Sequence, residues 1–275
     1  MIIRGGRIAL VLLTAAVAWS PAASGEQIGP AASPPPVAPG YLAKGAAPDA
    51  LAILPPPPKH GSAAEAEDQA AFVSTRSLQG TPRWKMATND AVISTQSAYQ
   101  DYACALGVTL ETAQTPTLST LLVRVATDAR PVIDPPKDYY ARPRPFLDLK
   151  GPICVEDTSF LRAAASYPSG HATLGWTWGL ILAELAPDRS TQILSRARVY
   201  GESRVVCGVH YPSDIEAGRT NGSTLFAVLQ SDPAFRADME TARAEIAAAR
   251  KAGGGIKPDP EQCKLEKDTA ATRPW

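Results

Sequence analysis

Residues 168–187 read PSGHATLGWTWGLILAELAP, and this stretch decides the fold. After its first three residues the chain is apolar on nearly every side of a helical projection, which is typical of a helix buried at the centre of a protein. Pro187 ends the helical pattern. The sequence therefore predicts a central buried helix over residues 171–185. Its large apolar side chains are those of Leu174, Trp176, Trp178, Leu180, Ile181, Leu182 and Leu185.

Helical patterns also occur on both sides of this segment. Residues 118–125 carry an apolar stripe, and residues 235–249 mark a C-terminal amphipathic helix. Two more helices are expected over residues 190–206 and 213–230, with Pro212 in the first turn of the second. A chain of 275 residues that is 45% apolar can bury one sizeable core. The predicted fold class is therefore all-α, as a single-domain helical bundle.

Residues 1–24 have the organisation of a secretory signal peptide. Arg4 and Arg7 precede an apolar run, and small residues at 22–24 mark a cleavage site. The run is about a dozen residues long, against the roughly 20 that a membrane-spanning helix needs. We expect a periplasmic or secreted protein with no membrane association after cleavage.

The remaining chain divides by composition. Residues 25–58 contain ten of the 26 prolines in an alanine-rich background, so we expect an extended arm there. Residues 59–252 are assigned to the all-α domain and residues 253–275 to a C-terminal tail.

Charge and cysteine content narrow the partners and the compartment. The 27 basic residues balance the 27 acidic residues, so nucleic acid is not an expected partner. The four cysteines have no zinc-ligand spacing, and disulfides persist in an exported chain. Sequence cannot choose among the three pairings. Cys154 with Cys207 is favoured because both flank the histidine motifs, and buried free thiols are the alternative.

Two of the three histidines lie at expected helix boundaries. Ser169, Gly170 and His171 open the central helix, where free N–H groups favour an oxyanion such as phosphate, although serine and glycine are also common as simple caps. His210 and Asp214 are four residues apart across a proline turn. The carboxylate can hold one ring nitrogen and leave the other as base or nucleophile, and a purely structural His–Asp hydrogen bond is the alternative.

Three cationic residues, Lys137, Arg144 and Arg204, complete the pattern. Arginine neutralises phosphoryl oxygens with two parallel hydrogen bonds and lysine does so as a point charge. Each of them alone is more typical of a solvated surface. Read with the two histidines, they predict a phosphate site.

These segments together resemble the signature of the phosphatidic-acid-phosphatase type 2 superfamily, to which vanadium haloperoxidases are also similar. The spacing is Lys-x6-Arg-Pro from residue 137, Pro-Ser-Gly-His from residue 168, and Ser-Arg-x5-His-x3-Asp from residue 203. Within this superfamily the chain is most similar to the bacterial class A non-specific acid phosphatases. Residues 54–58 and 232–235 also resemble the sequences of that class. It departs from them at Ala165 and Ala172, where the class usually has Gly and Thr.

The resemblance implies a bundle of the phosphatase and haloperoxidase type and a role for each motif residue. His210 would attack phosphorus, Asp214 would orient it, and His171 would protonate the leaving alkoxide. Phosphate would be bound by Lys137, Arg144, Ser169, Gly170 and Arg204.

The implied enzyme hydrolyses a broad range of small phosphomonoesters without a metal or other cofactor. A homo-oligomer is compatible with the sequence, which does not decide the oligomeric state. Two alternatives stay open: a vanadium-dependent haloperoxidase, and an exported phosphate-binding protein without turnover.

Overall fold

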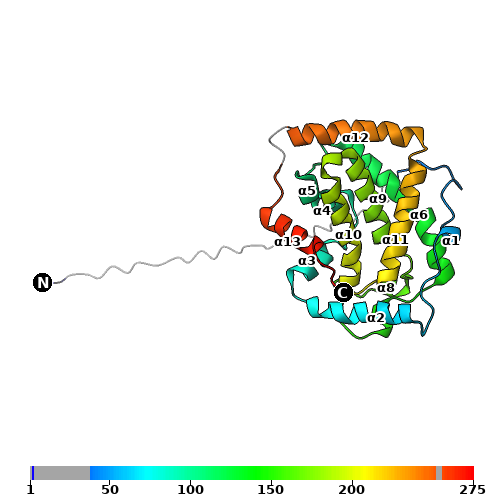
Figure 1. Cartoon of the computed structure of the whole chain (residues 1–275). Helices are drawn as coiled ribbons and strands as arrows, with labels where there is room; N and C mark the ends of the chain where they lie inside the picture. The colour runs from blue at the N-terminus through cyan, green and yellow to red at the C-terminus, as the bar shows by residue number, and fades with distance from the viewer. Residues whose placement is uncertain (1, 3–37, 252–255) are drawn as a thin grey trace. The chain divides into compact units, whose positions relative to one another are not determined.

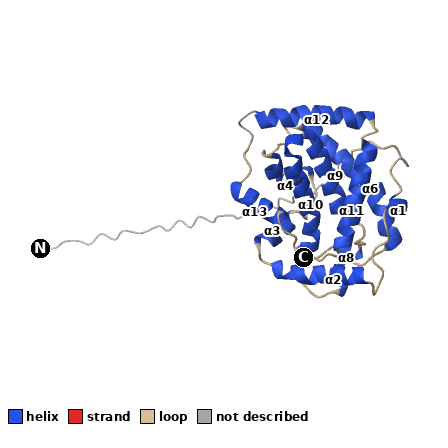
Figure 2. Cartoon of the chain, in the orientation of Figure 1, coloured by secondary structure: helices blue, strands red, loops and turns tan. Residues whose placement is uncertain are grey.

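The computed structural model of the chain describes residues 2, 38–251 and 256–275. Within these residues every regular element is a helix, as Figure 2 shows, so the all-α prediction is confirmed. The expected signal peptide and residues 25–37 of the expected arm lie outside the described residues, apart from residue 2. No helix in the described ranges is both long enough and apolar enough to cross a membrane.

The helices follow one another with short connections, as Figure 1 shows. Two of the connections contain a 3₁₀ turn, η1 (Arg76–Leu78) and η2 (Pro187–Arg189). The α-helices are α1 (Ala50–Ile53), α2 (Ala63–Thr75), α3 (Pro82–Asn89), α4 (Thr95–Asp101), α5 (Ala103–Leu106), α6 (Pro116–Tyr140), α7 (Pro145–Asp148), α8 (Ser159–Ala163), α9 (Gly170–Leu185), α10 (Ser190–Val206), α11 (Pro212–Leu229), α12 (Pro233–Lys251) and α13 (Pro260–Ala270).

The central helix is α9, as the sequence predicted. It packs against α10 and α11 along its length, and most of its residues are buried. Two glycines let α11 approach closely. A Cβ atom at Gly218 would lie 2.7 Å from the carbonyl oxygen of Ser169, and one at Gly222 would lie 2.7 Å from that of Thr173. Because glycine lacks this atom, the first turn of α9 can lie against the middle of α11.

Helices α6 and α12 pack against each other and against α9. The apolar stripe of α6 is buried in the main core, and so is that of α12. Helix α6 continues through Pro131, Pro135 and Pro136 and ends at Tyr140. The next residue, Ala141, caps it with a left-handed φ of 44°. Its last turn contains Lys137.

The described part of the expected arm packs onto the bundle. Tyr41 and Leu54 are buried in the main core. The N–H of Tyr41 donates to Asp128 of α6 at 2.7 Å. This part of the chain is therefore held by the domain through the buried side chains of Tyr41 and Leu54 and the bond to Asp128.

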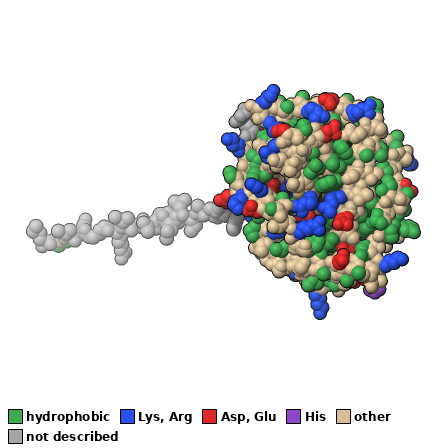
Figure 3. Space-filling view, in the orientation of Figure 1, with side chains coloured by type: hydrophobic (Ala, Val, Ile, Leu, Met, Phe, Trp, Pro, Cys, Tyr) green, Lys and Arg blue, Asp and Glu red, His purple; other side chains and the backbone are tan. Residues whose placement is uncertain are grey.

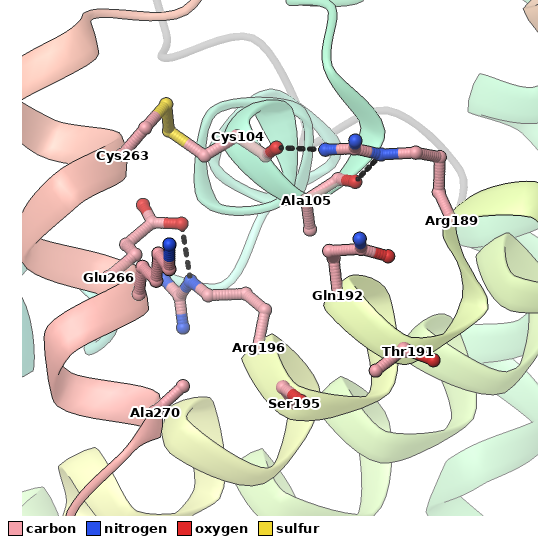
Figure 4. Close-up of a pocket in the computed structure, with 11 residues that line it drawn as sticks. Cys104, Ala105, Arg189, Thr191, Gln192, Ser195, Arg196, Cys263, Glu266 and Ala270 are labelled. Carbon is pink, nitrogen blue, oxygen red and sulfur yellow. Dashed lines mark hydrogen bonds and ion pairs between the residues drawn. A yellow bond between two sulfur atoms is a disulfide. The ribbon is translucent and has the colours of Figure 1, made fainter.

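Two disulfides join distant parts of the described chain: Cys154–Cys207 and Cys104–Cys263. The first is the pairing that the sequence favoured. Figure 4 shows the second, which joins α5 to α13 beside a cavity of about 320 Å³. Oε2 of Glu266 in α13 lies 3.6 Å from Nε of Arg196 in α10. Much of the C-terminal tail is thus a helix bound to the bundle.

Candidate active site

The predicted site residues come together where several helices begin or end. His171 lies in the first turn of α9, Asp214 in the first turn of α11, and Lys137 in the last turn of α6. His210 lies in the turn between α10 and α11. Arg204, in the last turn of α10, lowers the pKa of both histidines by its charge, so the two rings lie in one electrostatic environment.

His210 is buried, and each of its ring nitrogens faces a charged partner. Nδ1 lies 3.3 Å from Oδ2 of Asp214, and Nε2 lies 3.1 Å from Nη1 of Arg144. A guanidinium can only donate, so Nε2 accepts and the ring proton is on Nδ1, where the carboxylate accepts it. The lone pair of Nε2 is therefore directed toward the cationic side of the site.

The pKa of His210 is lowered well below its ordinary value. Burial is the largest cause, followed by the charges of Arg144, Lys137 and Arg204. All of these disfavour the protonated ring. The site therefore favours the neutral ring of His210, which keeps its lone pair on Nε2.

The three cations have few compensating charges. Burial lowers the pKa of Lys137 to about 8, and those of Arg144 and Arg204 to about 10. Arg204 is 3% exposed, and its buried Nε and Nη1 have no hydrogen-bond partner among the described residues. Within the described ranges, Lys137 donates only to a backbone carbonyl, that of Ala165. Unpaired buried N–H groups are costly, so an anion that accepts from them would stabilise this arrangement.

The start of α9 differs in one respect from the expectation. The N–H of Ser169 donates to the carbonyl of Asp214 at 3.0 Å, and its hydroxyl caps the helix by accepting from Ala172 at 3.2 Å. That amide is therefore not free for an anion. The N–H groups of Gly170 and His171 have no intrahelical acceptor, because they belong to the first turn.

His171 is half-buried, with its ring stacked 6.5 Å from that of Tyr200. Its Nε2 lies 3.0 Å from the carbonyl oxygen of Ala91, which can only accept, so Nε2 carries a proton. Burial and the charge of Arg204 lower its pKa well below the ordinary value. A bound anion would oppose the effect of Arg204 on this pKa.

Two charged residues behind Asp214 were missed by the sequence analysis. Arg142 donates to Asp214 at 2.7 Å and to Asp68 at 2.8 Å. Arg142 stands two residues before Arg144 in a cationic segment, which was a usable signal. Asp68 lies in α2, far from any motif, and only the fold brings it here.

Other features of the described surface are separate from this site. Figure 3 shows Lys and Arg side chains gathered on the face that carries α10 and α11. A groove of about 440 Å³ between these two helices is lined in part by Arg198, Arg219 and Arg273, and by none of the predicted site residues. Over residues 38–251 and 256–275 no three His, Cys, Asp or Glu side chains are grouped as a metal site would require.

Comparison with known proteins found one matching family model and several similar proteins. The model of the PAP2 superfamily matches residues 115–236, which include Lys137, His171, Arg204 and His210. An acid phosphatase of Zymomonas mobilis is 45% identical over 219 residues, which cover 79% of this chain and 82% of the relative. Non-specific acid phosphatases of Providencia stuartii and Salmonella typhimurium are each 35% identical. They match 77% and 70% of this chain, and 86% and 78% of their own lengths.

Proposed function

Because the chain belongs to the PAP2 superfamily, we propose that it is an acid phosphatase that hydrolyses phosphomonoesters through a phosphohistidine on His210. The observation that carries the proposal is the pair of contacts of the His210 ring. Asp214 faces Nδ1, and Nε2 faces the cations with its lone pair. A broad range of substrates is supported by the names of two relatives, which are non-specific acid phosphatases.

Phosphate binding would use the uncompensated charge of the site. The phosphoryl oxygens would accept from Lys137, Arg144, Arg204 and the N–H of Gly170, and the Ser169 hydroxyl is a further donor. In the free enzyme Nη1 of Arg144 occupies the lone pair of Nε2 on His210. If Nη1 of Arg144 donated to a phosphoryl oxygen instead, Nε2 would be free to face phosphorus.

The first chemical step transfers the phosphoryl group to the enzyme. The lone pair of Nε2 forms the N–P bond while the ester P–O bond breaks, and His171 gives its proton to the leaving alkoxide. The ring of His210 keeps its proton on Nδ1 and becomes an imidazolium that Asp214 stabilises without being protonated. The cations stabilise the charge on the phosphoryl oxygens throughout.

The second step releases phosphate. His171, now neutral, takes a proton from water as the water oxygen attacks phosphorus, and the N–P bond breaks. His210 regains its lone pair on Nε2.

The side chains of Lys137, Arg144 and Arg204 supply the positive charge that metal ions supply in other phosphatases, so we propose a metal-independent reaction. A periplasmic or secreted location is part of the proposal, and the two disulfides support it.

Turnover of nitrophenyl phosphate at mildly acidic pH, before and after exhaustive chelation, tests the proposal. We expect full activity in both samples. Activity that is lost on chelation and restored by added metal would contradict the metal-independent mechanism. Absence of turnover would favour a phosphate-binding protein, and vanadate-dependent halide oxidation without phosphatase activity would favour a haloperoxidase.

A further inference from the structure

A continuous line of hydrogen bonds leads from α2 to His210. Oδ2 of Asp68 accepts from Nη2 of Arg142 at 2.8 Å, and Nη1 of Arg142 donates to Oδ1 of Asp214 at 2.7 Å. Oδ2 of Asp214 then faces Nδ1 of His210. The exposed fractions are 3% for Asp68, 9% for Arg142, 0% for Asp214 and 2% for His210. Charges this well shielded from water act on one another more strongly than surface charges do.

The guanidinium of Arg142 is held in one orientation. It lies 4.1 Å from the centre of the Tyr211 ring, and Nη1 also donates to the hydroxyl of Ser213 at 2.8 Å. Asp68 is fixed in turn by the N–H of Ser213 at 3.0 Å. The planar fork of arginine can serve two carboxylates at once, whereas the ammonium of lysine is a point charge without that geometry.

The charges along this line leave a net negative charge behind His210. Asp68 and Asp214 are two anions against one cation, Arg142. The other charges that act on the His210 ring are cationic: Arg144, Lys137 and Arg204. If Asp68 were neutral, Arg142 would cancel the charge of Asp214, and nothing on this line would oppose the cations.

We propose that Arg142 and Asp68 are positioning residues of the reaction, which act on His210 through Asp214. They hold the carboxylate of Asp214 in place, so that the His210 proton stays on Nδ1. The net negative charge that they leave stabilises the imidazolium formed when Nε2 bonds to phosphorus. The inference rests on the proposed function of His210. It adds Asp68, a residue of α2 outside the range that the family model matches.

Asp68→Asn tests the charge with little change of shape. We expect kcat to fall about tenfold, which corresponds to roughly 1.4 kcal/mol of activation free energy, with little change in KM. The acid limb of kcat/KM should move to lower pH by about half a unit, because a lost anion makes His210 harder to protonate. A merely structural role would lower thermal stability without moving this limb.

The matched control is Asp238→Asn. Asp238 also accepts from an arginine, Arg124 at 3.2 Å, and from a hydroxyl, that of Tyr41 at 2.6 Å, but it lies in α12. This variant should keep the wild-type kcat and acid limb. Arg142→Lys provides a second test, because it keeps the charge and loses the fork, and it should also lower kcat.

A measurement independent of turnover is the ¹⁵N NMR spectrum of His210. The wild type should show a neutral ring with its proton on Nδ1. Asp68→Asn and Arg142→Lys should each show a mixture of tautomers or a shifted Nδ1 resonance. An unchanged spectrum and an unchanged acid limb in Asp68→Asn would overturn the inference, even if phosphohistidine is still trapped. A changed spectrum in an enzyme that forms no phosphohistidine would retain the positioning role and refute the proposed function.

Discussion

The two histidines of the site face different atoms, and this difference separates their proposed roles. Nε2 of His171 faces a backbone carbonyl and Nε2 of His210 faces a guanidinium. The first nitrogen must carry a proton and the second must offer its lone pair. His210 is therefore suited to attack phosphorus, and His171 can take up and give away a proton at Nδ1.

His171→Ala should affect poor leaving groups most. General acid catalysis is typically worth about 10² to 10⁴ in rate, and an alkyl phosphate, which expels a basic alkoxide, should lose this full factor. A nitrophenyl phosphate expels a stabilised phenolate and should lose much less. The measurement is the ratio of kcat/KM for the two esters in wild type and variant. Equal losses for both esters would show that His171 is not the proton donor.

Arg204→Met should stabilise the free protein and weaken phosphate binding. The variant removes buried N–H groups that have no described partner, whose burial costs about 1–3 kcal/mol. We expect a melting temperature a few degrees higher than that of the wild type, and little further rise on adding phosphate. The control is Arg196→Met, since Arg196 is equally buried but pairs with Asp90 at 2.6 Å, and should be strongly destabilised. Equal destabilisation of both variants would mean that Arg204 is a structural residue.

At the scale of helices, the local sequence pattern was sufficient for three of the elements that carry the site. The helices expected over residues 171–185, 190–206 and 213–230 are α9, α10 and α11, with bounds shifted by at most one residue. Apolar periodicity and proline positions are local properties, so the bounds of these helices can be predicted from the sequence. Asp68 of α2 pairs with Arg142, and the Ser169 N–H donates to the carbonyl of Asp214. Both contacts join segments that are distant in the sequence, so no local pattern predicts them.

Gly218→Ala should separate α9 from α11. The added Cβ would lie 2.7 Å from a carbonyl oxygen of α9, so one helix must shift, at a cost of about 1–3 kcal/mol in the free energy of unfolding. Because His171 lies in the first turn of α9 and Asp214 lies one turn before Gly218 in α11, kcat should fall as well. Thr220→Ala, an exposed change on the same helix, is the control for urea unfolding and activity. Wild-type kcat in Gly218→Ala would show that the site tolerates this movement.

At the scale of the whole described domain, the two disulfides stabilise different parts. Cys104–Cys263 spans 159 residues and holds α13, and Cys154–Cys207 spans 53 residues and ends three positions before His210. The sequence favoured the second pairing only because both cysteines flank motifs. The cysteine in the tail had no such marker, and its pairing depends on where α13 packs.

Replacing each pair by serines should separate stability from activity. Loss of Cys104–Cys263 should cost roughly 3–5 kcal/mol of unfolding free energy, because its loop is long. It should leave kcat near the wild-type value, because the cavity beside it is lined by none of the predicted site residues. Loss of Cys154–Cys207 should lower both, because that bridge ends beside the turn that carries His210. Urea unfolding and nitrophenyl phosphate turnover measure the two effects. Equal losses of kcat in both variants would contradict this division.

The central claim of a phosphohistidine on His210 is tested most directly by trapping the intermediate. The enzyme is mixed rapidly with a phosphorus-labelled ester, quenched in alkali, digested and mapped by mass spectrometry. We expect label on Nε2 of His210 that is stable to base and lost in acid, and no label in His210→Ala. Label on another residue, or an equal yield from His210→Ala, would contradict the claim.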